Sequence, residues 1–148
     1  AKKGEVLSRR LLRDLDLGEI GHFLALTPND DVNTLAVARF RRISRAPKVH
    51  QIRPSTELGR PLPHYASELQ APQVAAGATL DKLAALEKAG AVIRTLPADE
   101  VASLGELRER LGNDSAPLFA VDEEKRVSFV HADQPWPTAG TLVALAPP

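Results

Sequence analysis

The chain has 148 residues, 43% of them hydrophobic and 26% charged, and its formal net charge is zero. This size and balance indicate a globular chain with a real core and exclude an intrinsically disordered one. Because it contains no cysteine, disulfides, thiolate metal sites and cysteine nucleophiles are excluded as well.

The chain begins with a predicted short helix that Ser8 caps and Gly18 ends. Residues 22–26 then predict a short buried strand, because FLAL, residues 23–26, is a continuous apolar run. No apolar run approaches the ~18 residues of a membrane span. The chain also lacks methionine, so we expect Ala1 to follow a cleavage site or to begin a fragment of a longer protein.

A second helix is predicted after the first strand, begun by Asn29 or Asp30 and ended by Pro47. Residues 49–53 alternate in polarity as a strand does. Strand, helix and strand in this order predict a right-handed βαβ unit with two parallel strands. The apolar stripe of the helix is predicted from a spacing of three or four residues: Val32, Leu35, Ala36, Phe40 and Ile43.

The stretch 54–72 holds four prolines and no periodicity, which indicates a linker. We therefore predict a first domain over 1–54, a linker over 55–71 and a second domain over 72–148.

The second domain begins with a predicted helix that Thr79 caps and Gly90 ends. A strand is predicted over 91–96 and a helix over 101–111. The segments PLFAV and VSFVHA, separated by the charged DEEKR, predict a hairpin, and residues 141–146 a last strand. The second domain is thus predicted to hold a mostly antiparallel sheet and two helices.

The zero net charge hides an asymmetry, since residues 1–54 sum to 11 − 6 = +5 and residues 55–148 to 8 − 13 = −5. Opposite signs suggest two lobes that attract each other or a basic face turned to an anionic partner. Nucleic-acid binding surfaces show denser clusters with stacking aromatics, so we expect a solvated helix face and no nucleic acid. The scattered basic residues are Arg39, Arg41, Arg42, Arg45 and Lys48, with only Phe40 between them.

Motifs for catalysis and phosphate binding are missing from the chain. There is no G-x-G-x-x-G, P-loop, G-x-S-x-G or HExxH, and we expect no metal site. Capping and solvation explain the acidic clusters at Asp30–Asp31, Asp99–Glu100 and 122–124. We therefore predict that the chain is not an enzyme.

The stretch TPNDDVN, residues 27–33, is the most informative on function. A polar cluster at the carboxyl end of a parallel strand, opening a helix, lies where open α/β sheets bind ligands. The same letters also make an ordinary turn with a good helix cap. Residue chemistry alone leaves both interpretations open.

The run HFLALTPNDDVNTLAVARFRR, followed by VHQIRP, resembles the fourth strand, fourth helix and fifth strand of RCK-type (TrkA-N-like) Rossmann domains. Together with PLFAVDEEKRV and GTLVALAPP, this wording is similar to the cytoplasmic tail of bacterial sodium–proton antiporters. The resemblance covers residues 4–53 and, more weakly, 72–146, where Ala139 stands in place of an expected acidic residue. It implies an α/β fold: a truncated Rossmann-like βαβ unit (the second half of RCK-N) and a small α+β lobe of the RCK-C kind.

The resemblance also implies a function, namely a non-catalytic, ligand-sensing regulatory domain of a monovalent cation–proton antiporter (a sodium/hydrogen exchanger). Its partners would be the transmembrane antiporter domain of the same full-length chain and a second copy in a homodimer, on the cytoplasmic side of the cell membrane. The residues expected to face the ribose or base of a nucleotide such as NAD(H), ATP or ADP, or to sense an ion, are Thr27, Asn29, Asp30 and Asn33. The glycine loop of such a domain would precede Ala1, so we expect no cofactor in this fragment.

Two alternatives remain at this point. The chain could be the C-terminal fragment of a nicotinamide-dependent oxidoreductase, which needs an acid or base near the sheet edge; His50 and His22 are the candidates. It could instead be a purely structural dimerisation module, because a strand that lacks its neighbouring strands can pair with the edge strand of a second copy.

Overall fold

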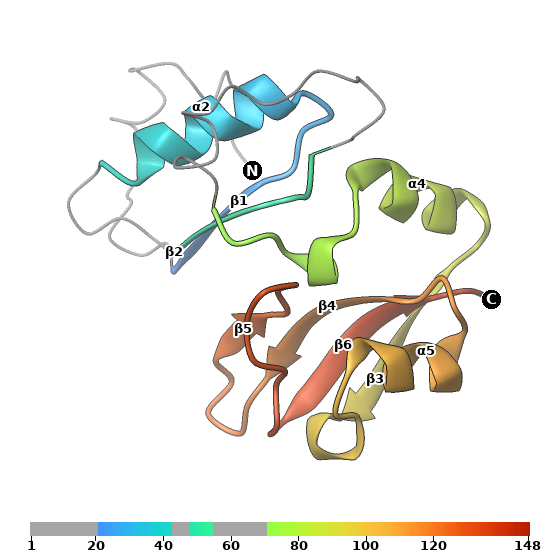
Figure 1. Ribbon diagram of the computed structural model, residues 1–148. Coiled ribbons are helices and arrows are strands. Elements are labelled where there is room, and N and C mark those ends of the chain that lie inside the picture. Colours follow the sequence, from blue (N-terminus) through green and yellow to red (C-terminus); the bar gives the residue numbers. More distant parts are fainter. Residues whose placement is uncertain (1–20, 43–47, 55–70) are drawn as a thin grey trace. The chain divides into compact units, whose positions relative to one another are not determined.

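The computed structural model describes residues 21–42, 48–54 and 71–148 (Figure 1). The described chain divides into two compact units. Unit 1 contains the elements before residue 52 together with residues 71–72, and unit 2 contains residues 52–54 and 73–148. The predicted helix capped by Ser8 and nearly all of the predicted linker lie outside the described residues, so the predicted domain limits stay a prediction.

Unit 1 is a βαβ unit of strand β1 (His22–Ala25), helix α2 (Asp30–Phe40) and strand β2 (Lys48–Gln51). The two strands are parallel, as the sequence predicts, and Leu24 lies opposite His50. The core of unit 1 is small and apolar: Ala25, Val37 and Ala71, with Phe23 and Val49 packed against them.

The buried face of α2 differs from the predicted stripe. Leu35 is 54% exposed, whereas Val37 is fully buried and the polar Asn33 begins the buried face. Asn33, Ala36, Val37 and Phe40 follow helical spacing, so the helix has the expected period but a different rotation. The rotation follows from Asn33, whose amide turns inward to bond Thr27.

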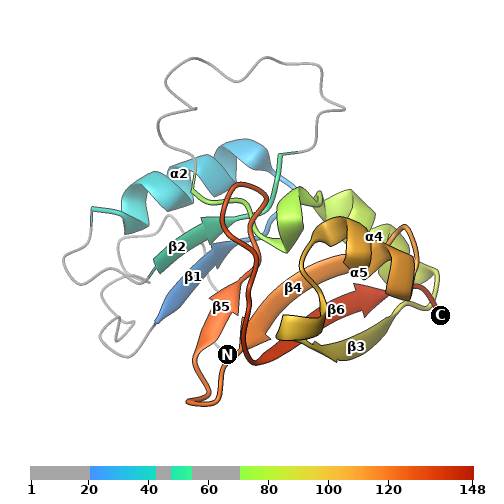
Figure 2. The ribbon, with the colours of Figure 1, turned by 60° about the horizontal axis from the view of Figure 1, so that its bottom comes forward.

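Unit 2 holds an antiparallel sheet with the strand order β3-β6-β4-β5 (Figure 2). Its strands are β3 (Val92–Pro97), β4 (Ala116–Val121), β5 (Val127–Phe129) and β6 (Thr141–Ala146). A parallel βαβ unit and a separate lobe of helices on an antiparallel sheet make the chain an α/β protein, which confirms the predicted fold class.

Two helices belong to unit 2, α4 (Leu80–Lys88) and α5 (Leu104–Leu111). The second begins three residues later than predicted because Val101 is fully buried after the 3₁₀ turn η4 (Ala98–Glu100) and Ser103 is the N-cap. The core beneath α5 joins helix, turn and sheet: Ala98, Val101, Leu107, Val130, Leu142 and Ala144.

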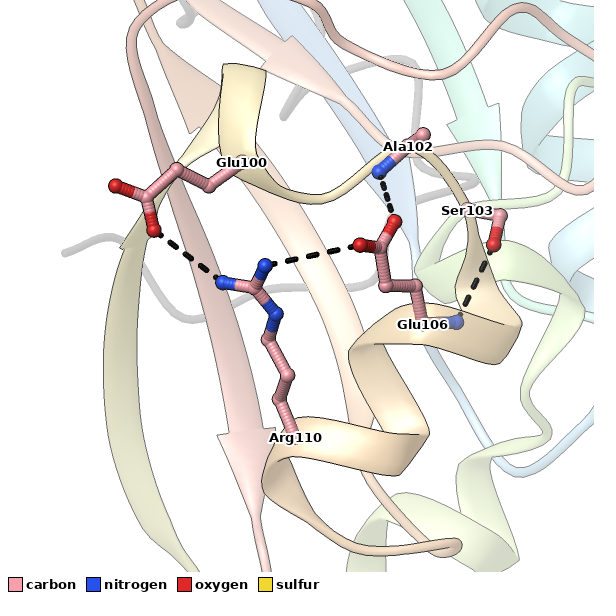
Figure 3. A network of polar contacts seen from close by, with 5 residues as sticks. All are labelled: Glu100, Ala102, Ser103, Glu106 and Arg110. Carbon is pink, nitrogen blue, oxygen red and sulfur yellow. Dashed lines mark hydrogen bonds and ion pairs between the residues drawn. The ribbon is translucent and has the colours of Figure 1, made fainter.

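The start of α5 is held by a network of polar contacts (Figure 3). The Ser103 hydroxyl accepts the backbone N–H of Glu106 at 3.2 Å, and the Glu106 carboxylate accepts that of Ala102 at 2.8 Å. Arg110 reaches back to Glu106 at 3.6 Å and to Glu100 at 3.2 Å. Reciprocal contacts of this kind satisfy the N–H groups that a helix start leaves unpaired.

Left-handed backbone occurs in several turns of unit 2, among them the 3₁₀ turn η3 (Ala75–Gly77) and the turn before β6. In η3, all three residues have positive φ, at 57°, 50° and 77°. At the entry to β6, Gly140 has φ 85°, and a Cβ there would collide with the carbonyl oxygen of Val121.

Within the described ranges, no helix has the length and apolar character that crossing a membrane requires.

Candidate functional site

The turn between β1 and α2 closes on itself through Thr27 and Asn33. The Asn33 side chain is buried, at 3% exposed; its Oδ1 accepts the Thr27 N–H at 3.0 Å and lies 2.8 Å from the Thr27 hydroxyl. Its Nδ2 donates to the Thr27 carbonyl at 2.8 Å. Asn33 therefore ties the end of the strand to the first turn of the helix.

The other two predicted site residues open the helix. Asn29 is the N-cap, with its Oδ1 accepting the N–H of Val32 at 3.0 Å. Asp30 follows in the first turn beside Asp31, where the helix dipole favours negative charge. The structure thus brings Thr27, Asn29 and Asn33 into one bonded cluster with Asp30 next to it. These bonds account for a capped turn, and ligand contact by the four residues stays a prediction.

Gln51 is a polar residue at the same edge of the sheet that the sequence analysis did not single out. It ends β2 opposite Ala25, and its side chain is 2% exposed. Neither its Oε1 nor its Nε2 has a hydrogen-bond partner within the described part of the chain. A buried amide without a hydrogen-bond partner costs about 1–3 kcal/mol of folding free energy. A native protein keeps such a group where another interaction offsets this cost or where a ligand binds the amide. In the sequence, Gln51 is one polar residue of an alternating strand, and no sequence signal identifies it as a candidate site residue.

The two histidines of unit 1 contact each other across the strands. His22 Nδ1 lies 2.9 Å from His50 Nε2, and the rings stack with centroids 5.2 Å apart. One ring nitrogen thus serves the other as a hydrogen-bond partner, an arrangement that links β1 to β2. Among the described residues, no group of three or more potential ligands could hold a metal ion.

The acidic clusters of unit 2 have structural partners. In the β4–β5 turn, the Asp122 carboxylate accepts the backbone N–H of Arg126 at 2.8 Å and its guanidinium at 2.7 Å. These contacts, the backbone bond first, hold the pKa of Asp122 below its ordinary value. Glu100 pairs with Arg110. The turn accounts for Asp122, and an ion pair accounts for Glu100.

Unit 2 also contains a cavity of about 400 Å³ that the sequence does not reveal. Three cationic side chains line it, Arg53, Lys82 and Arg108, together with the backbone of η3 and the buried Ser115. We call it the basic cavity. Its three cationic residues are far apart along the chain and match no motif, so only the fold brings them together.

No protein-family model and no curated protein matches the sequence. Among solved structures, the chain is similar to one described as the crystal structure of the GsuK RCK domain, with 11% sequence identity and a TM-score of 0.38. The match covers 97% of this chain and 34% of that one, so the chain spans about a third of its length.

Proposed function

We propose that the chain is a regulatory, non-catalytic domain of the RCK type that senses a ligand at the carboxyl edge of β1 and β2. The proposal extends to its setting: a homodimeric domain on the cytoplasmic side of a monovalent cation–proton antiporter, joined to the transmembrane part of the same full-length protein. The resemblance of residues 4–53 to such domains supports this setting. The observation that carries ligand sensing is the buried, unpaired amide of Gln51.

Gln51 and the Thr27–Asn33 turn lie at the same end of the parallel strands, because Gln51 pairs with Ala25, two residues before Thr27. An amide offers one acceptor and two donors, which suit the hydroxyls of a ribose or the edge of an adenine. A nucleotide such as NAD(H), ATP or ADP would satisfy both amide atoms. Its phosphates would require the glycine loop of a complete domain, which this chain lacks.

Calorimetry on two proteins tests the proposal: the 148-residue chain, and a version carrying an N-terminal Rossmann half of the RCK type. We expect weak or no binding of adenine nucleotides by the former and measurable binding by the latter. In the longer protein, Gln51→Leu and Asn33→Ala should each weaken binding by about 1–3 kcal/mol, since each removes a buried hydrogen-bonding group.

The two variants differ in their effect on folding, which separates a binding role from a structural one. Gln51→Leu removes an unpaired polar group and should leave the free protein equally or more stable. Asn33→Ala breaks the bonds to Thr27 and should destabilise unit 1. Unchanged nucleotide affinity in Gln51→Leu, or tight binding by the 148-residue chain alone, would contradict the proposed site.

A further inference from the structure

The basic cavity collects positive charge without matching negative charge. Arg53 and Arg108 form no ion pair within the described residues, and no acidic side chain is among the residues that line the cavity. Lys82 contacts Asp114 at 3.6 Å, but the carboxylate is 74% exposed. Such an exposed pair is weak and is easily exchanged for a better anion.

Two polar groups at the cavity are buried and lack a partner. Ser115 is 0% exposed and its Oγ has no hydrogen-bond partner, and the Nε of Arg108 is likewise buried and unpaired within the described chain. The guanidinium N–H can only donate and the hydroxyl can donate as well as accept, so one acceptor placed here would satisfy both groups. Buried donors in native proteins have acceptors, and a bound ligand is one way to supply them.

The backbone of the cavity wall also favours an anionic ligand. The cavity wall includes Thr79, the N-cap of the nine-residue helix α4, whose Oγ1 accepts the N–H of Lys82 at 3.2 Å. A helix N-terminus carries a partial positive charge and favours anions. Gly77, with φ 77°, forms another part of the wall, and a Cβ there would lie 3.2 Å from the Ala132 side chain and 3.9 Å from that of Arg53. The left-handed turn thus lets the backbone pass close to Arg53.

We propose that the basic cavity binds a phosphate-bearing small molecule, with Arg53, Lys82 and Arg108 holding the phosphate and Ser115 donating a hydrogen bond to it. Guanidinium groups bind phosphate oxygens in pairs, which favours this anion over a spherical one. A volume of about 400 Å³ exceeds what one phosphate fills, so the cavity leaves room for an organic group attached to the phosphate. This site belongs to unit 2 alone and does not depend on the proposed function of unit 1.

Isothermal titration of the 148-residue chain with inorganic phosphate and with ribose 5-phosphate tests the site, at constant ionic strength. We expect saturable binding, with a dissociation constant for phosphate of about 0.1–5 mM and tighter binding of the ester. Arg108→Gln should weaken binding about 10- to 100-fold, because it removes a charge-assisted contact. Raising the salt concentration should weaken it further.

Arg94→Gln is the matched control, since Arg94 lies on β3 outside the cavity and the charge change is the same. It should leave the affinity for phosphate unchanged. Ser115→Ala covers the case in which an arginine variant misfolds: it removes an unpaired buried hydroxyl, so it should fold with an unchanged or higher melting temperature while binding phosphate about 3- to 10-fold more weakly.

Three results would overturn the proposal: no saturable binding of either probe, equal weakening by Arg94→Gln and Arg108→Gln, or unchanged affinity in Ser115→Ala. Binding of acetate as tight as that of phosphate would overturn the phosphate assignment. Gln51→Leu separates this site from the one proposed in unit 1, because it should leave phosphate binding intact whether or not the nucleotide proposal holds.

Discussion

His131 links the folding of unit 2 to pH. The side chain lies next to β5 and is 9% exposed. Burial lowers the pKa of His131 below its ordinary value, and a hydrogen bond with Gln134 and the charge of Asp133 oppose that effect only in part. The folded protein therefore favours the neutral ring, whereas the unfolded chain protonates near pH 6.5.

The sign of the pH effect follows from this difference. Above about pH 6.5 the ring is neutral in both states, so His131 adds no pH dependence. Below that value the unfolded chain binds the proton first, and stability falls with the pH until the folded pKa is passed. Urea unfolding between pH 5 and 7.5 should show this loss in the wild-type chain and a smaller one in His131→Gln. Identical pH profiles would mean that the ring is as easily protonated in the folded protein as in the unfolded one.

At the scale of the element, the Ser103 hydroxyl is one of the contacts that hold the first turn of helix α5. Ser103 accepts the N–H of Glu106, so Ser103→Ala should lower the free energy of unfolding of unit 2 by about 1 kcal/mol. Ser103→Asp keeps an acceptor and places a negative charge at the positive end of the helix, so it should retain most of the stability. Thermal unfolding of the two variants checks this, and an equal loss in both would show that the cap contributes little.

Elements with strong local signals could be predicted from the sequence. Thr79 and Gly90 bracket α4 as expected, and β6 has the predicted limits, because caps and short apolar runs are local properties. The start of α5 could not be predicted, because Val101 lies in the core although it precedes the helix. In the sequence, such an apolar residue cannot be distinguished from one on the buried face of the helix. The exposure of Leu35 escaped prediction because a bond between Asn33 and Thr27 sets the rotation of α2.

The residues of the candidate sites also differ in whether a local sequence signal identifies them. The polar turn at residues 27–33 could be found because its letters are adjacent. Gln51 could not, since its unpaired state depends on what buries it. The strand predicted over 49–53 ends at Gln51, and Arg53 instead bridges to Thr79 in unit 2, where it joins the basic cavity. No local sequence pattern predicts that Arg53 pairs outside the sheet of β1 and β2.

At the scale of the whole molecule, the edge of the sheet in unit 2 bears on association. Strand β3 is an edge strand, and its Ile93 is 58% exposed, with Val92 exposed beside it. Exposed apolar edges pair readily with a second edge. We therefore expect a homodimer in light scattering at concentrations of tens of micromolar.

Ile93→Lys tests which surface is used, because a lysine on an edge strand disfavours pairing. It should shift the protein toward a monomer, whereas Val127→Lys, at the exposed β5 on the other edge, should not. A wild-type chain that is monomeric, or a dimer that survives Ile93→Lys, would exclude this edge as the interface.

The strand order of unit 2 also has a consequence for biosynthesis. Strand β6 lies between β3 and β4, although it is the last of the three to be made. Residues 98–140, 140 − 97 = 43 residues, separate β3 from β6. At roughly 5–20 residues per second, β3 therefore waits about 2–9 s for its partner on the ribosome. During that interval the exposed apolar side chains of β3 have no sheet to join. A nascent chain paused before residue 141 should therefore be the form of this protein that chaperones bind most strongly.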